Sequence, residues 1–213
     1  MTEEFFTKLK EQIQPYFEEG GSHEFSHTWR VYQMSILLAK DEKADLEIVK
    51  SAALLHDIAR LKEDCGKVNC HAEEGANMAK EILQKTDFPK KKIAAVCESI
   101  RVHRHSAQIT PKNKEQAILQ DADRLDALGA ITIGRMFSSG GKIGTPMFKP
   151  DIPIGKTYPG YKSDSTIHGF HAKILKIKPE TFHTKLAREL AKDRYLFVEQ
   201  FLERFVNEWN GKK

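Results

Sequence analysis

The sequence predicts an all-α protein, and three observations support that prediction. Apolar residues recur at spacings of three and four along most of the chain, which is the period of a helix with one buried face. No run of useful length shows the two-residue alternation of a half-buried strand. Hydrophobic residues make up 40% of the 213 positions, which is enough to build a core. We therefore expect a bundle of helices.

The first predicted helix covers residues 2–18, where apolar side chains fall on one face and Gly20-Gly21 ends the segment. Either Ser22 or Ser26 is expected to cap the helix that follows. Further helices are predicted from the same periodicity at residues 45–60, 71–85, 89–104 and, as a longer element, 112–137.

The composition changes at Ser138. Residues 138–165 read SSGGKIGTPMFKPDIPIGKTYPGYKSDS, and this Gly- and Pro-rich stretch predicts a long loop without helix. Its Lys and Tyr side chains suit a lid over a phosphate site, and equally an ordinary surface loop. Helical periodicity returns at residues 166–177 and 180–209.

The sequence contains neither an internal repeat nor a clear linker, so we expect a single domain over residues 1–213. In this interpretation the core motifs lie in residues 22–137, the loop follows at 138–165, and C-terminal helices occupy residues 166–210.

Charge and cysteine content narrow the class of protein. The net charge is +4, with Lys and Arg scattered, which suits a substrate that carries phosphates better than nucleic acid. Three cysteines argue against a disulfide framework and for a reducing cytoplasm. There is no signal-peptide pattern, and no run approaches the roughly 18 apolar residues that span a bilayer. We expect a cytoplasmic protein without a membrane partner; no pattern predicts its oligomeric state.

The strongest local anomaly is the pair His56-Asp57, which follows Leu54-Leu55 inside a stretch that reads as a buried helix. Burying a carboxylate is costly unless it is paired or binds a metal. Adjacent helical residues point about 100° apart, so the two side chains can lie on either side of one ion.

Two other segments supply matching ligands. His27 lies one predicted helix earlier, and three carboxylates, Asp121, Asp123 and Asp126, lie within six residues of an apolar helix. Asp123 and Asp126 share a side of that helix while Asp121 points almost oppositely, so wheel geometry alone does not decide among them. Imidazole and carboxylate ligands together suit Mn, Fe, Zn, Co or Ni better than Ca.

These residues resemble the H…HD…D signature of the HD-domain phosphohydrolase superfamily, with His27, then His56-Asp57, then Asp123 within Ala122-Asp123-Arg124-Leu125. The segments around them are similar to one bacterial subfamily of nucleotide (pyro)phosphohydrolases over nearly the whole chain. The resemblance implies an all-α HD-domain helical bundle with the metal in a central cleft.

The resemblance also implies a ligand set and a cofactor. The ligands would be His27, His56, Asp57 and Asp123, and they would hold one divalent ion, with Mn, Co, Ni, Fe, Mg and Zn all compatible. The choice of Asp123 rests on the Ala-Asp-Arg-Leu alignment. Asp126 would then orient a ligand or Arg124, or pair with a nearby basic residue.

Four further residues are expected to meet the substrate. Arg60 matches a position where HD enzymes often carry Lys or Arg, and it would contact phosphate unless it only caps its own helix. His103 resembles the family's substrate-side histidine. His71 would bind substrate, since extra histidines in related proteins contact phosphate or bind a second metal. Arg124 is expected to neutralise phosphate charge.

The function implied is metal-dependent hydrolysis of a phosphate ester or phosphoanhydride in a nucleotide substrate, with Asp57, Arg60 and His103 in catalytic roles. The subfamily resemblance points to (deoxy)nucleoside triphosphates cleaved to monophosphate and pyrophosphate. The alternatives are a nucleoside monophosphate phosphatase, a phosphodiesterase, and a metal-bearing regulatory domain without activity.

Overall fold

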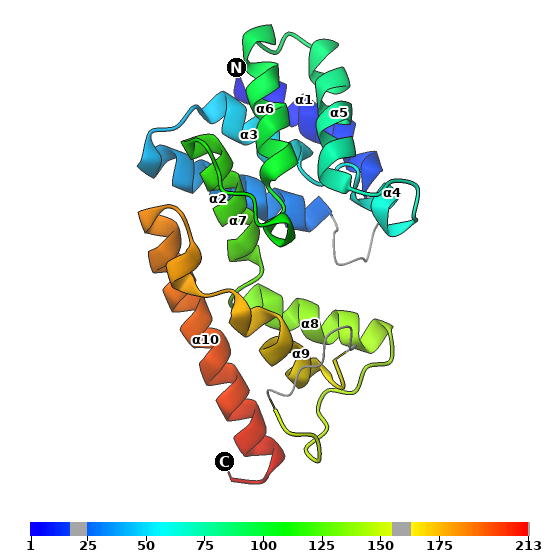
Figure 1. The fold of residues 1–213 in the computed structure, drawn as a ribbon, viewed down its shortest axis with the longest axis vertical. Coiled ribbons are helices and arrows are strands. Elements are labelled where there is room, and N and C mark those ends of the chain that lie inside the picture. Colours follow the sequence, from blue (N-terminus) through cyan, green and yellow to red (C-terminus); the bar gives the residue numbers. More distant parts are fainter. Residues whose placement is uncertain (18–24, 155–162, 213) are drawn as a thin grey trace. The chain divides into compact units, whose positions relative to one another are not determined.

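The computed structural model describes residues 1–17, 25–154 and 163–212 (Figure 1). Every regular element in these ranges is helical, which confirms the predicted all-α class. The chain divides into two compact units, Met1–Asp123 and Arg124–Lys213, and each is described by itself. The expectation of a single domain over the whole chain stays a prediction. No helix in the described ranges is both long and apolar enough to cross a membrane.

The first unit is built around one buried helix, α3. Its elements are α1 (Glu3–Ile13), the 3₁₀ turn η1 (Gln14–Tyr16), α2 (Phe25–Glu42), α3 (Leu46–Leu55), α4 (Arg60–Asp64), α5 (His71–Gln84), α6 (Lys90–Val102), the 3₁₀ turn η2 (His105–Ala107) and α7 (Lys114–Asp126). Helix α3 packs against α1, α2, α5 and α6.

Helix α3 begins at a side-chain cap and is then buried on all sides. The Asp45 carboxylate accepts hydrogen bonds from the backbone N–H groups of Glu47 at 3.0 Å and Ile48 at 3.4 Å. Every residue from Val49 to Leu55 is buried. The buried Lys50 keeps its charge satisfied through an ion pair with Glu3.

The predicted helix 45–60 is wrong at its C-terminal end, because α3 stops at Leu55 and residues 56–59 form turns. The imidazole Nδ1 of His56 donates a hydrogen bond of 2.8 Å to the carbonyl of Ala53. In a continuing helix the N–H of Asp57 would use that carbonyl. The side chain of His56 therefore replaces a backbone bond at the helix end, and a new helix starts only at Arg60.

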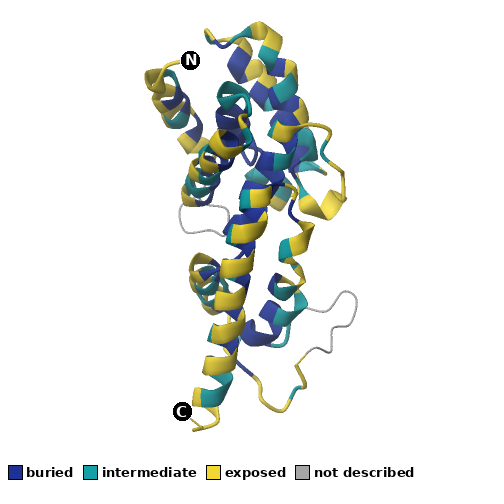
Figure 2. Ribbon diagram, turned by 90° about the vertical axis from the view of Figure 1, so that its left-hand side faces the viewer, coloured by how far each residue is buried: buried dark blue, intermediate teal, exposed yellow. Residues whose placement is uncertain are grey.

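The second unit contains α8 (Ala130–Lys142), α9 (Thr166–Ala172), the 3₁₀ turns η3 (Ile174–Lys176) and η4 (Pro179–Thr181), and α10 (Lys185–Trp209). Aromatic rings from α8, α9 and α10 meet in its core, where the ring of Phe137 lies 5.7–6.1 Å from those of Phe170, Phe201 and Phe205. Buried and exposed residues alternate along α10 (Figure 2), as an amphipathic helix requires.

The predicted long helix 112–137 is instead two helices, α7 and α8, separated at Gly129. Gly129 adopts φ +84° and ψ −159°, a backbone region open to glycine but strained for other residues. A Cβ at this position would lie 3.1 Å from Cγ of Arg194, whose guanidinium donates to the carbonyl of Leu125.

Gly129→Ala should therefore lower the free energy of unfolding by about 1–3 kcal/mol, the usual cost of holding a non-glycine residue in such a conformation. Thermal and denaturant unfolding followed by circular dichroism would measure the change. Gly134→Ala is the matched control, because a Cβ on this α8 glycine meets no atom within 4 Å. It should be neutral or stabilising; equal losses in both variants would contradict the role of Gly129.

The predicted start of the Gly/Pro-rich loop at Ser138 is also wrong, because α8 continues to Lys142. Glycine costs a helix about 1 kcal/mol relative to alanine, but here packing requires it: a Cβ on Gly140 would lie 2.5 Å from Oγ1 of Thr166. Residues 143–154 and 163–165 contain no helix, as expected. Residues 155–162 lie outside the described residues, and the lid role of the loop stays a prediction.

Candidate metal centre

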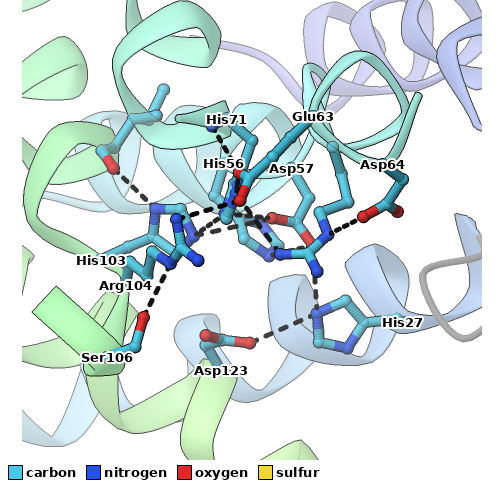
Figure 3. Close-up of polar contacts among 12 residues, drawn as sticks. His27, His56, Asp57, Glu63, Asp64, His71, His103, Arg104, Ser106 and Asp123 are labelled. Carbon is cyan, nitrogen blue, oxygen red and sulfur yellow. Dashed lines mark hydrogen bonds and ion pairs between the residues drawn. The ribbon is translucent and has the colours of Figure 1, made fainter. Parts of the chain in front are cut away.

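Polar side chains from helix ends of the first unit meet around Asp57 (Figure 3). Each lies where a helix starts or stops, so a short side chain can reach a common centre. They are His27 in the first turn of α2, His56 at the C-cap of α3, His71 as the first residue of α5, His103 at the C-cap of α6 and Asp123 in the last turn of α7.

His56 and His103 are oriented by the same local device. The Nδ1 of His56 donates to the carbonyl of Ala53 at 2.8 Å, and the Nδ1 of His103 donates to the carbonyl of Ile100 at 2.6 Å. A carbonyl oxygen only accepts, so the proton must be on Nδ1 in both rings. Each Nε2 is thereby directed away from its own helix and towards the centre.

The Asp57 carboxylate lies between two pairs of imidazoles. Its Oδ2 is 3.8 Å from Nε2 of His27 and 3.7 Å from Nε2 of His56. Its Oδ1 is 3.3 Å from Nε2 of His71 and 3.6 Å from Nε2 of His103. The carboxylate is only 5% exposed, so these imidazoles are its immediate surroundings. Two groups of potential metal ligands thus share Asp57, one with His27 and His56 and one with His71 and His103.

Asp123 joins the first group through His27, whose Nε2 lies 3.3 Å from Oδ1 of Asp123. Burial opposes ionisation of this carboxyl, but the hydrogen bond from His27 and the neighbouring imidazoles outweigh it and lower its pKa to about 2. Asp126 is engaged elsewhere, because it accepts a hydrogen bond of 2.7 Å from Arg135 within the second unit. Asp121 is fully buried. The geometry thus favours Asp123 as the ligand over Asp126.

The residues present fit a divalent ion. Nε2 of His56 is buried and has no hydrogen-bond partner among the described residues, which is costly unless a ligand completes it. Burial lowers the pKa of His56 to about 4, so the ring is neutral and Nε2 carries a lone pair. Ligand atoms about 2.0–2.2 Å from a tetrahedral ion lie about 3.3–3.6 Å apart. The separations of 3.8 Å between His27 and Asp57, 3.7 Å between His56 and Asp57 and 3.3 Å between His27 and Asp123 are close to that range.

A cavity of about 320 Å³ opens beside this centre. It is lined by the whole second ligand group, by Asp123, and by basic and polar side chains from α4 and from the segment after α6; His27 and His56 are not among its described lining residues. The lining residues are Asp57, Arg60, His71, His103, Arg104, His105, Ser106 and Asp123. The predicted substrate residues Arg60, His71 and His103 are therefore brought together with the predicted ligands Asp57 and Asp123.

Two arginines stand at this cavity. The Nε of Arg60 lies 3.2 Å from the Asp64 carboxylate, and its Nη1 lies 3.4 Å from Nδ1 of His71. Arg104 donates through Nε to Ser106 at 2.7 Å, and its Nη1 lies 3.1 Å from Oε1 of Glu63. Both side chains are partly exposed, at 25% for Arg60 and 34% for Arg104, and both line the cavity.

The pKa values of the two histidines on the cavity side are shifted in opposite directions. Burial lowers the pKa of His71. Burial also works against a charge on His103, but the hydrogen bond and negative charge of Asp57 outweigh it and raise the pKa of that ring. Their Nε2 atoms lie 3.3 Å apart, so a proton on His103 can be shared with the lone pair of His71.

Arg124 is not among the described residues that line the cavity. Within the second unit its guanidinium donates to the carbonyl of Thr181 at 2.9 Å and to the Thr181 hydroxyl, and lies 4.2 Å from the ring centroid of Phe182. Its predicted contact with phosphate stays a prediction.

The sequence interpretation did not assign a site role to Glu63, Arg104 or Ser106. Glu63 contacts both His71 and Arg104. Burial opposes its ionisation, but hydrogen bonds from the backbone and ring of His71 and the nearby Arg104 lower its pKa to about 2. The available signal was the run Arg101 to Ser106, where basic residues and a hydroxyl follow directly on the end of an apolar helix.

Comparison with known proteins agrees with this geometry. The family model of the HD domain matches residues 25–128, which include His27, His56, Asp57 and Asp123. The crystal structure of an HD-superfamily hydrolase from Bacillus thuringiensis is 32% identical and covers 98% of each chain with a TM-score of 0.78. A predicted HD superfamily hydrolase from an uncultured Thermotogales bacterium is 35% identical, covering 95% of this chain and 92% of that one, with a TM-score of 0.69.

A third relative is the protein YpgQ of Bacillus subtilis, which is 29% identical over 222 residues, covering 96% of this chain and 95% of YpgQ. The crystal structure of YpgQ in complex with ADP superimposes with a TM-score of 0.73 over 98% of this chain and all of that chain (100%), at 24% identity.

Proposed function

Because this chain belongs to the HD superfamily of hydrolases, we propose that it hydrolyses nucleotides with a divalent ion held by His27, His56, Asp57 and Asp123. The proposed substrates are (deoxy)nucleoside triphosphates, cleaved to a monophosphate and pyrophosphate. One observation carries the proposal: a buried His–Asp ligand group adjoins a cavity lined by two arginines.

When bound, such an ion lowers the pKa of a water from about 15.7 to about 7 and polarises a phosphoryl oxygen. The chain's own residues supply the rest. Asp57 and Asp123 provide the negative charge that would retain a cation beside the neutral ring of His56. In the proposed hydrolysis, the oxygen of water bonds to the α-phosphorus and the water gives up a proton to the solvent. The bond to the bridging oxygen breaks, and its electron pair leaves with pyrophosphate.

Arg60 and Arg104 are the groups that would bind the phosphates. A guanidinium presents several N–H donors to phosphate oxygens and keeps its charge at every physiological pH. Two of them at one cavity suit a chain of phosphates better than a single phosphate. His103, whose pKa Asp57 raises, can donate a proton to a phosphate oxygen as negative charge develops there.

The relative YpgQ supports a nucleotide as the ligand, since it was crystallised with ADP. A nucleoside diphosphate carries two phosphates, which matches the two arginines at this cavity. We extend that ligand class to this chain as part of the proposal.

A nucleotide panel tests the proposed reaction. Purified protein would be incubated with nucleoside mono-, di- and triphosphates and Mn, Co, Ni, Mg or Zn, and the products resolved by chromatography. Monophosphate and pyrophosphate in equal amounts from triphosphates are the expected products. Orthophosphate released from monophosphates would favour the phosphatase alternative, and cleavage of a phosphodiester alone would favour a phosphodiesterase. Binding of nucleotide without turnover under every metal would favour a regulatory domain.

The metal content of the purified protein should be one divalent ion per chain, bound by the group that contains the unpartnered Nε2 of His56. Inductively coupled plasma mass spectrometry on dialysed protein would measure it. His56→Ala should bring the content close to zero. Two ions per chain would contradict the single-ion proposal and would assign the second to Asp57, His71 and His103.

A further inference from the structure

Glu63 on α4 contacts two residues of the cavity without lining it, among the described residues. Its Oε2 accepts a hydrogen bond of 2.7 Å from the backbone N–H of His71 and a second one from Nδ1 of the same residue. Its Oε1 lies 3.1 Å from Nη1 of Arg104. Each oxygen of one carboxylate therefore holds a different cavity residue (Figure 3).

The contact with His71 fixes which ring nitrogen carries the proton. A carboxylate only accepts hydrogen bonds, so Nδ1 of His71 must be protonated. The opposite nitrogen, Nε2, then presents its lone pair 3.3 Å from Oδ1 of Asp57 and 3.3 Å from Nε2 of His103. Glu63 also caps helix α5. Cys70, at the N-cap position, makes no side-chain cap, and the Glu63 carboxylate instead accepts the hydrogen bond from the backbone N–H of His71.

The contact with Arg104 fixes a guanidinium that would otherwise be flexible. Arg104 follows the end of α6 on a short connection to η2, and its side chain is 34% exposed. Glu63 and Ser106 engage Nη1 and Nε, which are two of the three guanidinium nitrogens. Since arginine has five N–H donors, others remain for a phosphate oxygen.

We propose that Glu63 is a positioning residue that holds His71 in one tautomer and Arg104 at the cavity, and so prepares both for a phosphate-bearing substrate. This inference rests on the proposed function for its kinetic consequence, but its effect on His71 is independent of turnover. Glu63 acts through these two residues and does not itself meet the substrate.

Glu63→Gln keeps the shape of the side chain and removes its charge. Loss of a group that orients an active-site residue typically costs about 10–100-fold in activity, and we expect a fall of that size in kcat/KM for nucleotide hydrolysis. The matched control is Glu74→Gln, because Glu74 forms an ion pair of 2.5 Å with Lys62 that also joins α4 to α5 but lies away from the cavity residues. The control should keep its kcat/KM. Equal losses in both variants would show that only the packing of α4 on α5 matters and would overturn the proposal.

A double-mutant cycle separates positioning from a general structural effect. In a His71→Ala background no side-chain donor faces Glu63, so Glu63→Gln should cost clearly less there than in the wild type. Fully additive losses in kcat/KM would contradict action through His71. If Glu63→Gln fails to fold, Glu63→Asp, which keeps the charge on a shorter side chain, takes its place in the same cycle.

Nuclear magnetic resonance of the imidazole nitrogens tests the positioning role without any substrate. At a pH where His71 is neutral, wild-type protein should show Nδ1 protonated and Nε2 bare, and Glu63→Gln should show a mixture of tautomers. Glu74→Gln should retain the wild-type pattern. An unchanged tautomer in Glu63→Gln would overturn the inference. If the wild type hydrolyses no nucleotide but the tautomer changes as expected, the proposed function fails while the positioning of His71 stands.

Discussion

Asp57→Ala is expected to abolish nucleotide turnover and metal binding together while leaving the helical content intact. Asp57 is the one carboxylate shared by both groups of potential ligands, and its oxygens lie 3.3–3.8 Å from four imidazole nitrogens. Without it, the remaining rings would have to hold a cation with much less negative charge. The loss of kcat/KM should exceed the roughly 100-fold that removal of a ligand's hydrogen-bonding partner costs.

The measurements are metal content by mass spectrometry, nucleotide hydrolysis, and far-ultraviolet circular dichroism. Asp41→Ala serves as the control, since it deletes the same side chain at an exposed position of α2. It should match the wild type in all three. An Asp57→Ala protein that still hydrolyses nucleotides would remove the proposed site, whatever its metal content.

Asp123→Asn and Asp126→Asn should have opposite effects on metal content and stability. Asp123 lies 3.3 Å from His27, and its side chain is 25% exposed, so the neutral variant should lose the ion while the unfolding free energy of the metal-free protein changes little. Asp126 is buried, and its carboxylate accepts a hydrogen bond of 2.7 Å from Arg135. Its variant should keep the ion and lose about 1–3 kcal/mol of stability, the usual cost of weakening a charged hydrogen bond.

Metal titration by calorimetry together with denaturant unfolding would separate these effects. Comparing the two variants also tests whether Asp123 or Asp126 is the correct choice among the aspartates of α7. Loss of the ion in Asp126→Asn, with retention in Asp123→Asn, would reverse the assignment.

The sequence alone identified the side chains that meet at the centre, because their chemistry is conspicuous. A His-Asp pair within an apolar stretch is costly to bury, so His56 and Asp57 could be singled out before any fold was known. The candidate ligands His27 and Asp123 followed from the resemblance. The geometry supports both, since they lie 3.3 Å apart although 96 positions separate them in the chain, from 27 to 123.

The sequence did not predict where the helices stop around these residues. Periodicity continues through residues 45–60, yet α3 ends at Leu55 because the ring of His56 bonds to the Ala53 carbonyl. Helix propensity likewise does not predict that α8 continues through Gly140. A glycine is needed at this position because Thr166, from a later part of the chain, approaches it closely. The first is a local side-chain bond that periodicity does not register, and the second is a tertiary contact that overrides local preference.

The sequence did not indicate a site role for Glu63, for a related reason. In the sequence it is one of several acidic residues near a helix end, and such residues are usually solvated. Only the fold brings it to the first residue of α5 and to Arg104. Residues that bind a metal directly follow a recognisable spacing in the sequence. Residues that only orient another side chain follow no such spacing.

The proposed ligands come from helix ends spread over α2, α3 and α7, and this distribution would couple cation affinity to global unfolding. An unfolded chain cannot present all four side chains at once, so occupancy favours the native state over the denatured ensemble. At a free cation concentration 100 times the dissociation constant, this mass-action effect amounts to about 2.7 kcal/mol. The melting temperature should therefore rise with cation concentration, so chelator treatment during purification would compromise shelf life as well as catalysis.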